Sequence, residues 1–130
     1  MNREIKFRAW LKEKKMMAEY ISHFKHSPNC GIFEITIPFD ESGLQTFRKL
    51  HSINQFDLMQ YTGLKDNNGK EIYEGDINSN DNNERSEVVF YAGGFYLKKN
   101  KTEYQHIGKN APFNLNVIGN IYENPDLISQ

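Results

Sequence analysis

The sequence predicts a mainly β protein, and three observations support this fold class. Apolar and polar residues alternate with a period of two along much of the chain of 130 residues, as in half-buried strands. Short apolar runs are separated by turn signals such as Asn68-Gly69 and Gly93-Gly94. Nine Phe and seven Tyr supply core side chains, although hydrophobic residues make up only 38% of the chain. We expect an N-terminal hairpin lobe with at most one short helix, then a small barrel-like (SH3-like) sheet of about five strands.

The N-terminal lobe begins with two strands. Ile5, Phe7 and Ala9 alternate with more polar residues, and the charged turn at 13–15 leads to a second run at 16–21. The segment from there to Phe33 is expected to be a loop. The run 33–39 alternates most regularly, and we expect it to be an edge strand because Pro38 cannot donate a ladder hydrogen bond.

The segment 42–56 predicts the one short helix. Its apolar residues Leu44, Phe47, Leu50 and Ile53 recur every third position, and Ser42 is a suitable N-cap.

The C-terminal lobe is expected to contain strands at 58–62, 71–77, 87–91, 95–99 and 115–122. A solvated polar loop covers 78–85, and a change in composition near residue 56 divides the single domain into sub-lobes 1–56 and 57–130. The alternation predicts that Phe7, Phe90 and Ile121 are core residues.

Charge and cysteine content narrow the function classes. The net charge is -1, with +3 on residues 1–65 and -4 on residues 66–130, so no global positive field attracts nucleic acid or an acidic membrane. The single cysteine, Cys30, excludes an internal disulfide and suits a reducing cytoplasm. No signal peptide or membrane-spanning apolar run is apparent, so we expect a cytoplasmic protein without a membrane partner.

Four groups of side chains were weighed as catalytic or metal sites. His23, His26 and Cys30, with His51 as a fourth ligand, form only a weak metal motif, and Cys30 beside His26 is an equally weak nucleophile pair. Glu74 and Asp76 are a carboxylate pair, and Asp66, Asn68 and Glu71 approach the spacing of a calcium loop without meeting it. Turn chemistry accounts for these acidic segments more simply, so we expect no catalytic residues, cofactor or metal. The structural turn residues are Asn68, Gly69, Gly75, Asp76, Gly93 and Gly94.

Lys98, Lys99 and Lys101 form a short basic run close to Tyr91, Phe95 and Tyr96. Basic and aromatic side chains on a small barrel can bind single strands by stacking. We favour instead a solvated strand edge, because this half of the chain is acidic and lysines commonly protect strand edges.

Three segments of the chain carry a family resemblance. The first is Lys6-Phe7-Arg8-Ala9-Trp10 with Lys15-Met16-Met17. The second is the long run 58–77, with Leu58-Met59-Gln60-Tyr61-Thr62-Gly63-Leu64-Lys65-Asp66 and Gly69-Lys70-Glu71-Ile72-Tyr73-Glu74-Gly75-Asp76-Ile77. The third is Val117-Ile118-Gly119-Asn120-Ile121-Tyr122-Glu123-Asn124-Pro125-Asp126-Leu127. These segments resemble the YopX family of phage and prophage proteins. The resemblance implies a phage origin and a largely β fold, and it brings no catalytic residues.

These observations favour a non-enzymatic phage accessory protein that acts through protein–protein contacts with a host or phage partner. We expect a homo-oligomer, with Phe33, Ile35 and Ile37 in its interface, because an exposed apolar edge invites pairing. The alternative is a small-barrel nucleic-acid-binding protein of phage replication or regulation, for which a steep salt dependence would be diagnostic.

Overall fold

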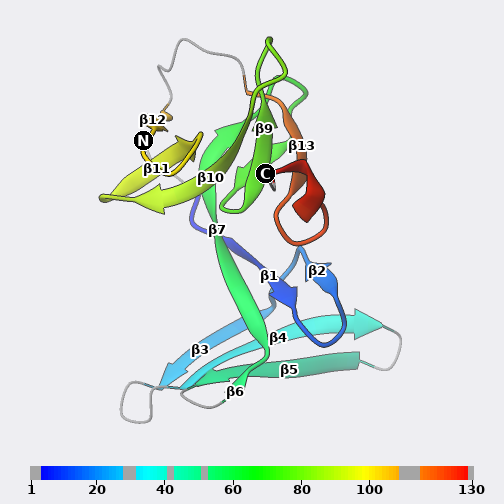
Figure 1. Ribbon diagram of the computed structural model, residues 1–130. Coiled ribbons are helices and arrows are strands. Elements are labelled where there is room, and N and C mark those ends of the chain that lie inside the picture. The colour runs from blue at the N-terminus through cyan, green and yellow to red at the C-terminus, as the bar shows by residue number, and fades with distance from the viewer. Residues whose placement is uncertain (1–3, 28–31, 41–42, 51–52, 109–114, 129–130) are drawn as a thin grey trace. The chain divides into compact units, whose positions relative to one another are not determined.

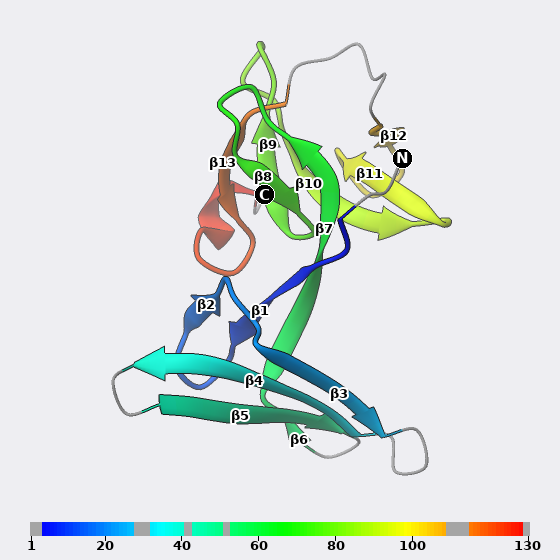
Figure 2. The same ribbon diagram turned by 180° about the vertical axis from the view of Figure 1, so that it is seen from behind.

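The computed structural model describes residues 4–27, 32–40, 43–50, 53–108 and 115–128 (Figures 1 and 2). Almost all regular structure in these residues is strand, and the single helix among them is the short 3-10 turn η1, Pro125–Leu127. The predicted mainly β fold class is therefore confirmed. No helix in the described ranges is long and apolar enough to cross a membrane.

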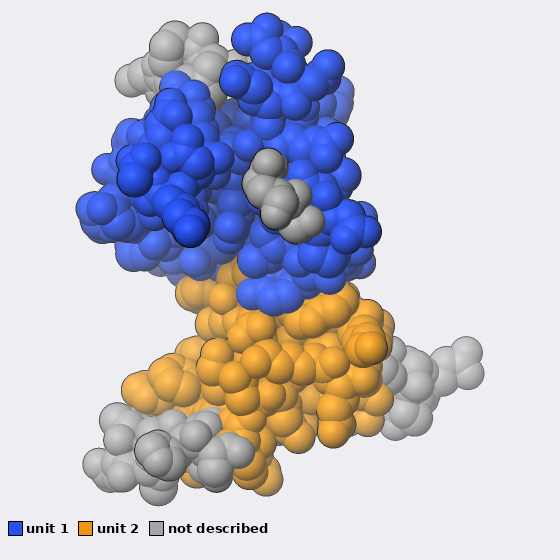
Figure 3. Space-filling view, viewed as in Figure 1, with its two compact units in different colours: residues 1–6, 60–130 blue, residues 7–59 orange. Residues whose placement is uncertain are grey.

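The chain divides into two compact units, coloured separately in Figure 3. Unit 2 is residues 7–59, and unit 1 combines residues 1–6 with residues 60–130. The strand β7, Phe56–Lys65, begins in unit 2 and continues into unit 1. The other strands of unit 2 are β1 Phe7–Leu11, β2 Met16–Ala18, β3 His23–Ser27, β4 Ile32–Asp40, β5 Gly43–Leu50 and β6 Ile53–Asn54.

Unit 2 is built on an antiparallel sheet with strand order β3-β4-β5-β6. The β1–β2 hairpin, which pairs Ala9 with Ala18, packs its apolar side chains onto one face of that sheet. The resulting core consists of Ala9, Leu11, Ala18, Ile35, Ile37 and Phe56. Burying apolar surface in this way is the main favourable term in folding.

Three expectations for unit 2 were wrong. The segment before Phe33 contains the strand β3 rather than only a loop, and the segment expected to be a helix contains the strand β5. On β5, Phe47 packs against the core while Leu44 is 61% exposed, so the spacing by three places the two side chains on opposite faces. The strand β4 is not an edge, because it pairs with β3 on one side and β5 on the other.

Unit 1 contains a curled five-stranded antiparallel sheet with strand order β12-β11-β10-β9-β13 (Figure 1). A further strand, β8, pairs with β7. The core of this unit consists of Ile72, Val88, Phe95, Leu97, Ile107 and Leu115. The strands are β8 Glu71–Tyr73, β9 Asp76–Ser79, β10 Arg85–Tyr91, β11 Gly94–Lys98, β12 Tyr104–His106 and β13 Val117–Asn120.

The structure also corrects three details in unit 1. The strand expected over 71–77 is divided at Gly75 into β8 and β9. Asn78 is buried at the start of the segment expected to be a solvated loop, and its Oδ1 accepts a hydrogen bond from the Asn116 N–H at 2.6 Å. Phe90 is 52% exposed and is not a core residue.

The other two expected core residues, Phe7 and Ile121, are partly exposed rather than buried. Phe90 lies on the inward side of β10, as the alternation predicts, because it pairs with the buried Phe95. It is nevertheless exposed, because it lies near the end of β10, beyond the core.

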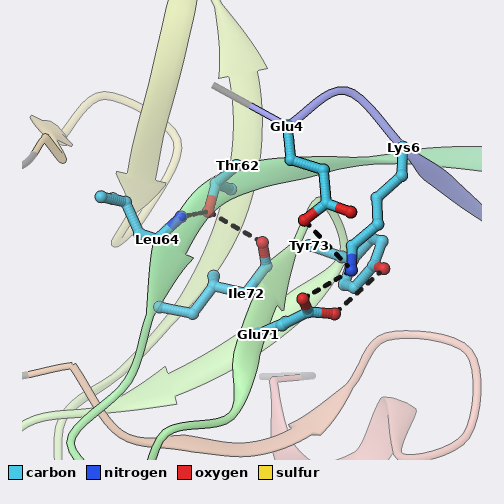
Figure 4. A network of polar contacts seen from close by, with 7 residues as sticks. All are labelled: Glu4, Lys6, Thr62, Leu64, Glu71, Ile72 and Tyr73. Atoms are coloured by element: carbon cyan, nitrogen blue, oxygen red, sulfur yellow. Dashed lines mark hydrogen bonds and ion pairs between the residues drawn. The ribbon is translucent and has the colours of Figure 1, made fainter. Parts of the chain in front are cut away.

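A polar cluster in unit 1 fixes the start of the chain to the strand β8 (Figure 4). Lys6 Nζ donates to Glu71 and lies 3.6 Å from a Glu4 carboxylate oxygen and 4.9 Å from the centre of the Tyr61 ring. The hydrogen bond to Glu71 is the main reason that the pKa of Lys6 is raised. The Tyr61 N–H, on the strand β7, also donates to Lys6 O at 2.9 Å, so the same residue is held by β7 and β8.

Candidate functional site

An aromatic surface covers the solvent side of β10, β11 and β12 in unit 1. The inward positions of β10 and β11 are filled by Val88, Phe95 and Leu97. Strand alternation turns the intervening residues outward, and the register pairs Tyr96 with His106 and Lys98 with Tyr104. Tyr91 belongs to the same outer row of β10. We call the set Tyr91, Tyr96, Tyr104 and His106 the tyrosine face.

The rings of the tyrosine face contact one another. Tyr91 and Tyr104 stack with ring centroids 4.4 Å apart and planes at 14°, and Tyr96 meets His106 edge-on at 5.1 Å. Tyr91 also meets Tyr96 edge-on at 5.6 Å. These mutual contacts hold the rings in place, and Tyr91 remains 50% exposed. The result is a pre-arranged π surface that faces solvent.

A cleft of about 820 Å³ adjoins the tyrosine face. Its cationic lining is Arg85, Lys98, Lys99 and Lys101, and its carboxylates are Glu84, Glu87 and Asp126. Lys98 connects the two features, because it lines the cleft and pairs with Tyr104 across the strands.

Hydrogen bonds fix the backbone turn that carries two of the lysines and hold the Arg85 side chain. Asn100 Oδ1 accepts the backbone N–H groups of Thr102 and Glu103 at 3.0 and 2.9 Å, which fixes the turn that carries Lys99 and Lys101. On the other wall, Arg85 Nη1 donates to the carbonyl oxygen of Leu127 at 3.1 Å.

The carboxylates of the cleft differ in their surroundings. Glu84 accepts a hydrogen bond from Asn80 Nδ2 at 2.9 Å. Glu87 lies opposite Lys98, and burial raises the pKa of its carboxyl group while the nearby ammonium opposes that change. Four cations and three carboxylates line the cleft, and the Lys99 ammonium also lies 3.9 Å from a carboxylate oxygen of Glu103.

A second exposed aromatic surface lies in unit 2. The core-facing side of β3 and β4 continues past the buried Ile35 to Phe24, His26 and Phe33. His26 stacks on Phe33 at 4.2 Å, and Phe24 lies 6.1 Å from Phe33 and 6.2 Å from Phe7. Phe24 is 47% exposed and Phe33 36% exposed. We call Phe24, His26 and Phe33 the phenylalanine face.

Of the three residues expected in an interface, the structure leaves only Phe33 accessible. Ile35 and Ile37 have 0% and 3% of their surface exposed and belong to the core of unit 2. They are therefore unavailable to a partner of the folded chain, and this part of the expectation was wrong.

The structure does not bring His23 and His26 together as ligands of one metal ion. His23 pairs with Thr36 and His26 with Phe33, so the two side chains project from opposite faces of β3. Cys30 and His51 lie outside the described residues. Among the residues that are described, no group of three or more His, Cys, Asp or Glu could hold a metal ion.

The turn residues have well-defined geometry. In the 66–70 loop, the Gly69 N–H donates to Asp66 O at 3.0 Å, and Gly69 has φ 82°. An Asn-Gly pair favours the primed two-residue hairpin turn, in which both central residues have positive φ. Among the described residues Asn68 does not have positive φ, so Asn68-Gly69 forms a turn of another type.

The primed turn type occurs instead at residues 92 and 93, between the paired residues Tyr91 and Gly94. Ala92 and Gly93 have φ of 49° and 83°.

The acidic residues that were weighed as ligands bind backbone groups. Asp66 is buried and accepts three N–H groups, from Asn68 and Lys70 at 2.9 Å and from Val117 at 3.0 Å. Asp76 Oδ2 accepts the Tyr73 N–H at 2.8 Å across the turn at Gly75. Glu74 Oε1 accepts the Gln60 N–H at 2.9 Å.

The sequence reasoning missed several residues of these surfaces, namely Tyr104, His106, Arg85 and Glu87 in unit 1 and Phe24 in unit 2. A signal was present, because Tyr104 and His106, like Phe24 and His26, alternate with polar residues. Such three-to-five-residue runs are too short to separate a strand from a loop by pattern alone.

Comparison with known proteins identified one family and two similar crystal structures. A family model described as YopX protein matches residues 6–129. The crystal structure of protein EF1440 from Enterococcus faecalis is similar, at 27% identity and a TM-score of 0.71 over 98% of this chain and 100% of that one. The crystal structure of protein yopX from Bacillus subtilis is 25% identical with a TM-score of 0.61 over 95% of each chain. No curated protein sequence matches.

Proposed function

This chain belongs to the YopX family, and from that premise we propose that it is a non-enzymatic phage or prophage accessory protein that acts through protein–protein contacts in the bacterial cytoplasm. The observation that carries the proposal is the phenylalanine face of unit 2. Phe24 and Phe33 are large apolar side chains on the core-facing side of a sheet, and they remain 47% and 36% exposed. Exposed apolar groups gathered on one surface are typical of protein contact sites.

The partner that we propose for this surface is a second copy of the chain. Two phenylalanine faces that meet about a two-fold axis would cover each other's rings, because an isologous contact brings the same patch from both copies together. Aromatic side chains contribute strongly at the centre of such interfaces. Lys49 pairs with Phe33 across the strands, and its ammonium lies 3.5 Å from an Asp57 carboxylate oxygen that Lys12 also approaches at 3.6 Å.

The opposite side of the same sheet is chemically different. Arg48 Nε donates to Glu34 at 2.8 Å, and Thr36 and Thr46 are hydrogen-bonded at 3.0 Å. This polar side suits solvent, which supports the phenylalanine face as the contact surface. It also carries Leu44, 61% exposed, as a matched apolar residue outside that face.

Light scattering across a wide concentration range tests the proposal. We expect the full chain to approach a multiple of the 15.2 kDa monomer mass, and the Phe24→Ser, Phe33→Ser double variant to remain a monomer at concentrations where the parent associates. Leu44→Ser, on the polar side, should leave the association unchanged. Circular dichroism checks that each variant is folded.

Two outcomes would contradict this function. A particle near the monomer mass at every concentration would remove self-association. An assembly that the double variant leaves intact, or that Leu44→Ser weakens equally, would remove the phenylalanine face as its interface.

A further inference from the structure

We propose that the tyrosine face and the adjoining cleft of unit 1 bind single-stranded nucleic acid, with bases stacked on the tyrosines and phosphates held by Lys98, Lys99, Lys101 and Arg85. This inference goes beyond self-association, concerns a different unit and rests on different residues. The basic run near aromatic residues was favoured as a solvated edge from the sequence alone. The register of β10, β11 and β12 instead places Lys98 on the same side of the sheet as Tyr91, Tyr96 and Tyr104.

The aromatic residues of this surface do not serve the core of unit 1. Val88, Phe95 and Leu97 already fill the inner side of the same strands. Three tyrosines and a histidine therefore occupy the solvent side, with Tyr91 half exposed. Exposed rings on a sheet are the stacking platform on which single-strand-binding proteins place successive bases, and every base offers a π surface to such a ring.

The cations lie next to the tyrosine face, where the backbone of a nucleic-acid strand bound across that face would continue. Lys98 pairs with Tyr104 across the strands and also lines the cleft, so the aromatic and cationic parts are contiguous. Lys99, Lys101 and Arg85 line the same cleft. A duplex would offer phosphates to these cations but no unstacked bases to the tyrosines, so the combination favours a single strand.

Glu87 allows nucleic-acid binding to be distinguished from a purely structural role of this surface. Its carboxylate lies opposite Lys98 in the path proposed for the phosphates, where a negative charge opposes binding. Glu87→Gln keeps the shape and removes the charge, so it should strengthen binding. A surface used only for structure or solubility gives no reason for that gain.

The experiment measures fluorescence anisotropy of a labelled oligothymidylate of about 20 nucleotides, titrated with the full-length chain at several salt concentrations. We expect saturable binding, tighter for the single strand than for a duplex of the same length. Lys98→Ala with Lys101→Ala should weaken binding by about tenfold and reduce the slope of log affinity against log salt by about 1.4. Lys65→Ala with Lys70→Ala, two exposed lysines of unit 1 outside the cleft, is the charge-matched control.

Tyr91 and Phe90 form a second matched pair. They are neighbours on β10 with 50% and 52% of their surface exposed, but they lie on opposite sides of the strand. Tyr91→Ala should weaken oligothymidylate binding by about tenfold, whereas Tyr91→Phe, which keeps the ring, and Phe90→Ala should change it little.

Thermal melting establishes that each variant is folded before its affinity is interpreted. The proposal is overturned if the parent chain does not bind the oligonucleotide at low salt, or binds the duplex equally well. It is also overturned if Tyr91→Ala acts no more strongly than Phe90→Ala, or if Glu87→Gln weakens binding.

Discussion

Ala92 has a left-handed backbone conformation, with φ 49°, although it carries a side chain. Residues other than glycine, asparagine and aspartate adopt this conformation at a cost of ~1–2 kcal/mol. The position is the first of a two-residue primed turn, where asparagine followed by glycine is the favoured pair. The turn thus retains strain that a single substitution can remove.

We expect Ala92→Asn to stabilise the protein by ~0.5–1 kcal/mol, because asparagine tolerates positive φ and Gly93 already follows it. Thermal melting should show a rise of a few degrees. A lower melting temperature would show that the 91–94 turn does not have this geometry.

Gly69 already has the residue type that its backbone needs, because its φ of 82° is readily adopted only by glycine. Its neighbour Asn68 does not have positive φ. A Cβ added at this position would have no atom within 4 Å, so the expected cost arises from the backbone conformation. Gly69→Val should destabilise the protein by ~1 kcal/mol or more in urea unfolding, because a β-branched residue resists positive φ. Asn68→Val is the control and should cost clearly less; equal costs would contradict the described loop.

Asp66 links the 66–70 loop to β13 through its three backbone N–H donors. Burial acts to raise the pKa of its carboxyl group, but the hydrogen bonds from Val117, Lys70 and Asn68 prevail and lower it. The ionised carboxylate therefore contributes stability above the pKa of the unfolded chain, and this contribution is lost as the pH falls through the lower pKa of the folded chain.

Asp66→Asn should cost ~2 kcal/mol at neutral pH, since one buried acceptor oxygen becomes an amide that cannot accept. In urea unfolding from pH 7 to strong acid, the difference between parent and variant should shrink as the pH falls. A difference that stays constant or grows in acid would contradict the assigned role of Asp66.

At the scale of the elements, the sequence pattern predicted strands well where alternation extends over several residues. The β4 run and the β10–β11 hairpin were recognised for this reason. The same pattern does not report where a core ends, and this accounts for the error at Phe90. The β10 strand extends beyond the cluster that buries Val88 and Phe95.

We therefore expect Phe90→Ala to cost ~1 kcal/mol, in contrast to ~2–5 kcal/mol for Ile77→Ala at a fully buried position of β9. Chemical unfolding of both variants gives the comparison. A loss at Phe90 as large as that at Ile77 would return Phe90 to the core and contradict the described strand end.

The expectations of an edge strand at 33–39 and of a helix at 42–56 were wrong because pairing between strands overrode the local sequence signals. Pro38 suggested an edge because proline lacks an N–H donor, yet β4 is interior and the register shifts between Pro38 and Asp40. The spacing by three in β5 suggested a helix, but tertiary pairing decided between the two readings. The tyrosine face was missed for a related reason. Tyr104 and His106 alternate with polar residues, but no single segment encodes the cross-strand register that brings them beside Tyr91 and Tyr96.

At the scale of the whole molecule, the chain has two units with separate cores. The first six residues belong to the unit formed by the C-terminal half of the chain, and no local sequence pattern reveals this. Residues 1–6 belong with residues 60–130, through the contacts of Lys6 with Tyr61 and Glu71. The sub-lobes expected at 1–56 and 57–130 do not include this return of the N-terminus. Each unit presents its own exposed aromatic surface, and we assign the two surfaces to different partners.

Nuclear magnetic resonance of the aromatic side chains tests this division most directly, because it observes both surfaces in one spectrum. Dilution of the protein should shift the signals of Phe24 and Phe33 and leave those of Tyr91, Tyr96 and Tyr104 in place. Addition of oligothymidylate to the dilute protein should shift the tyrosines and leave the two phenylalanines unchanged. Tyrosine signals that move on dilution, phenylalanine signals that move with the oligonucleotide, or two sets that never move would contradict the account.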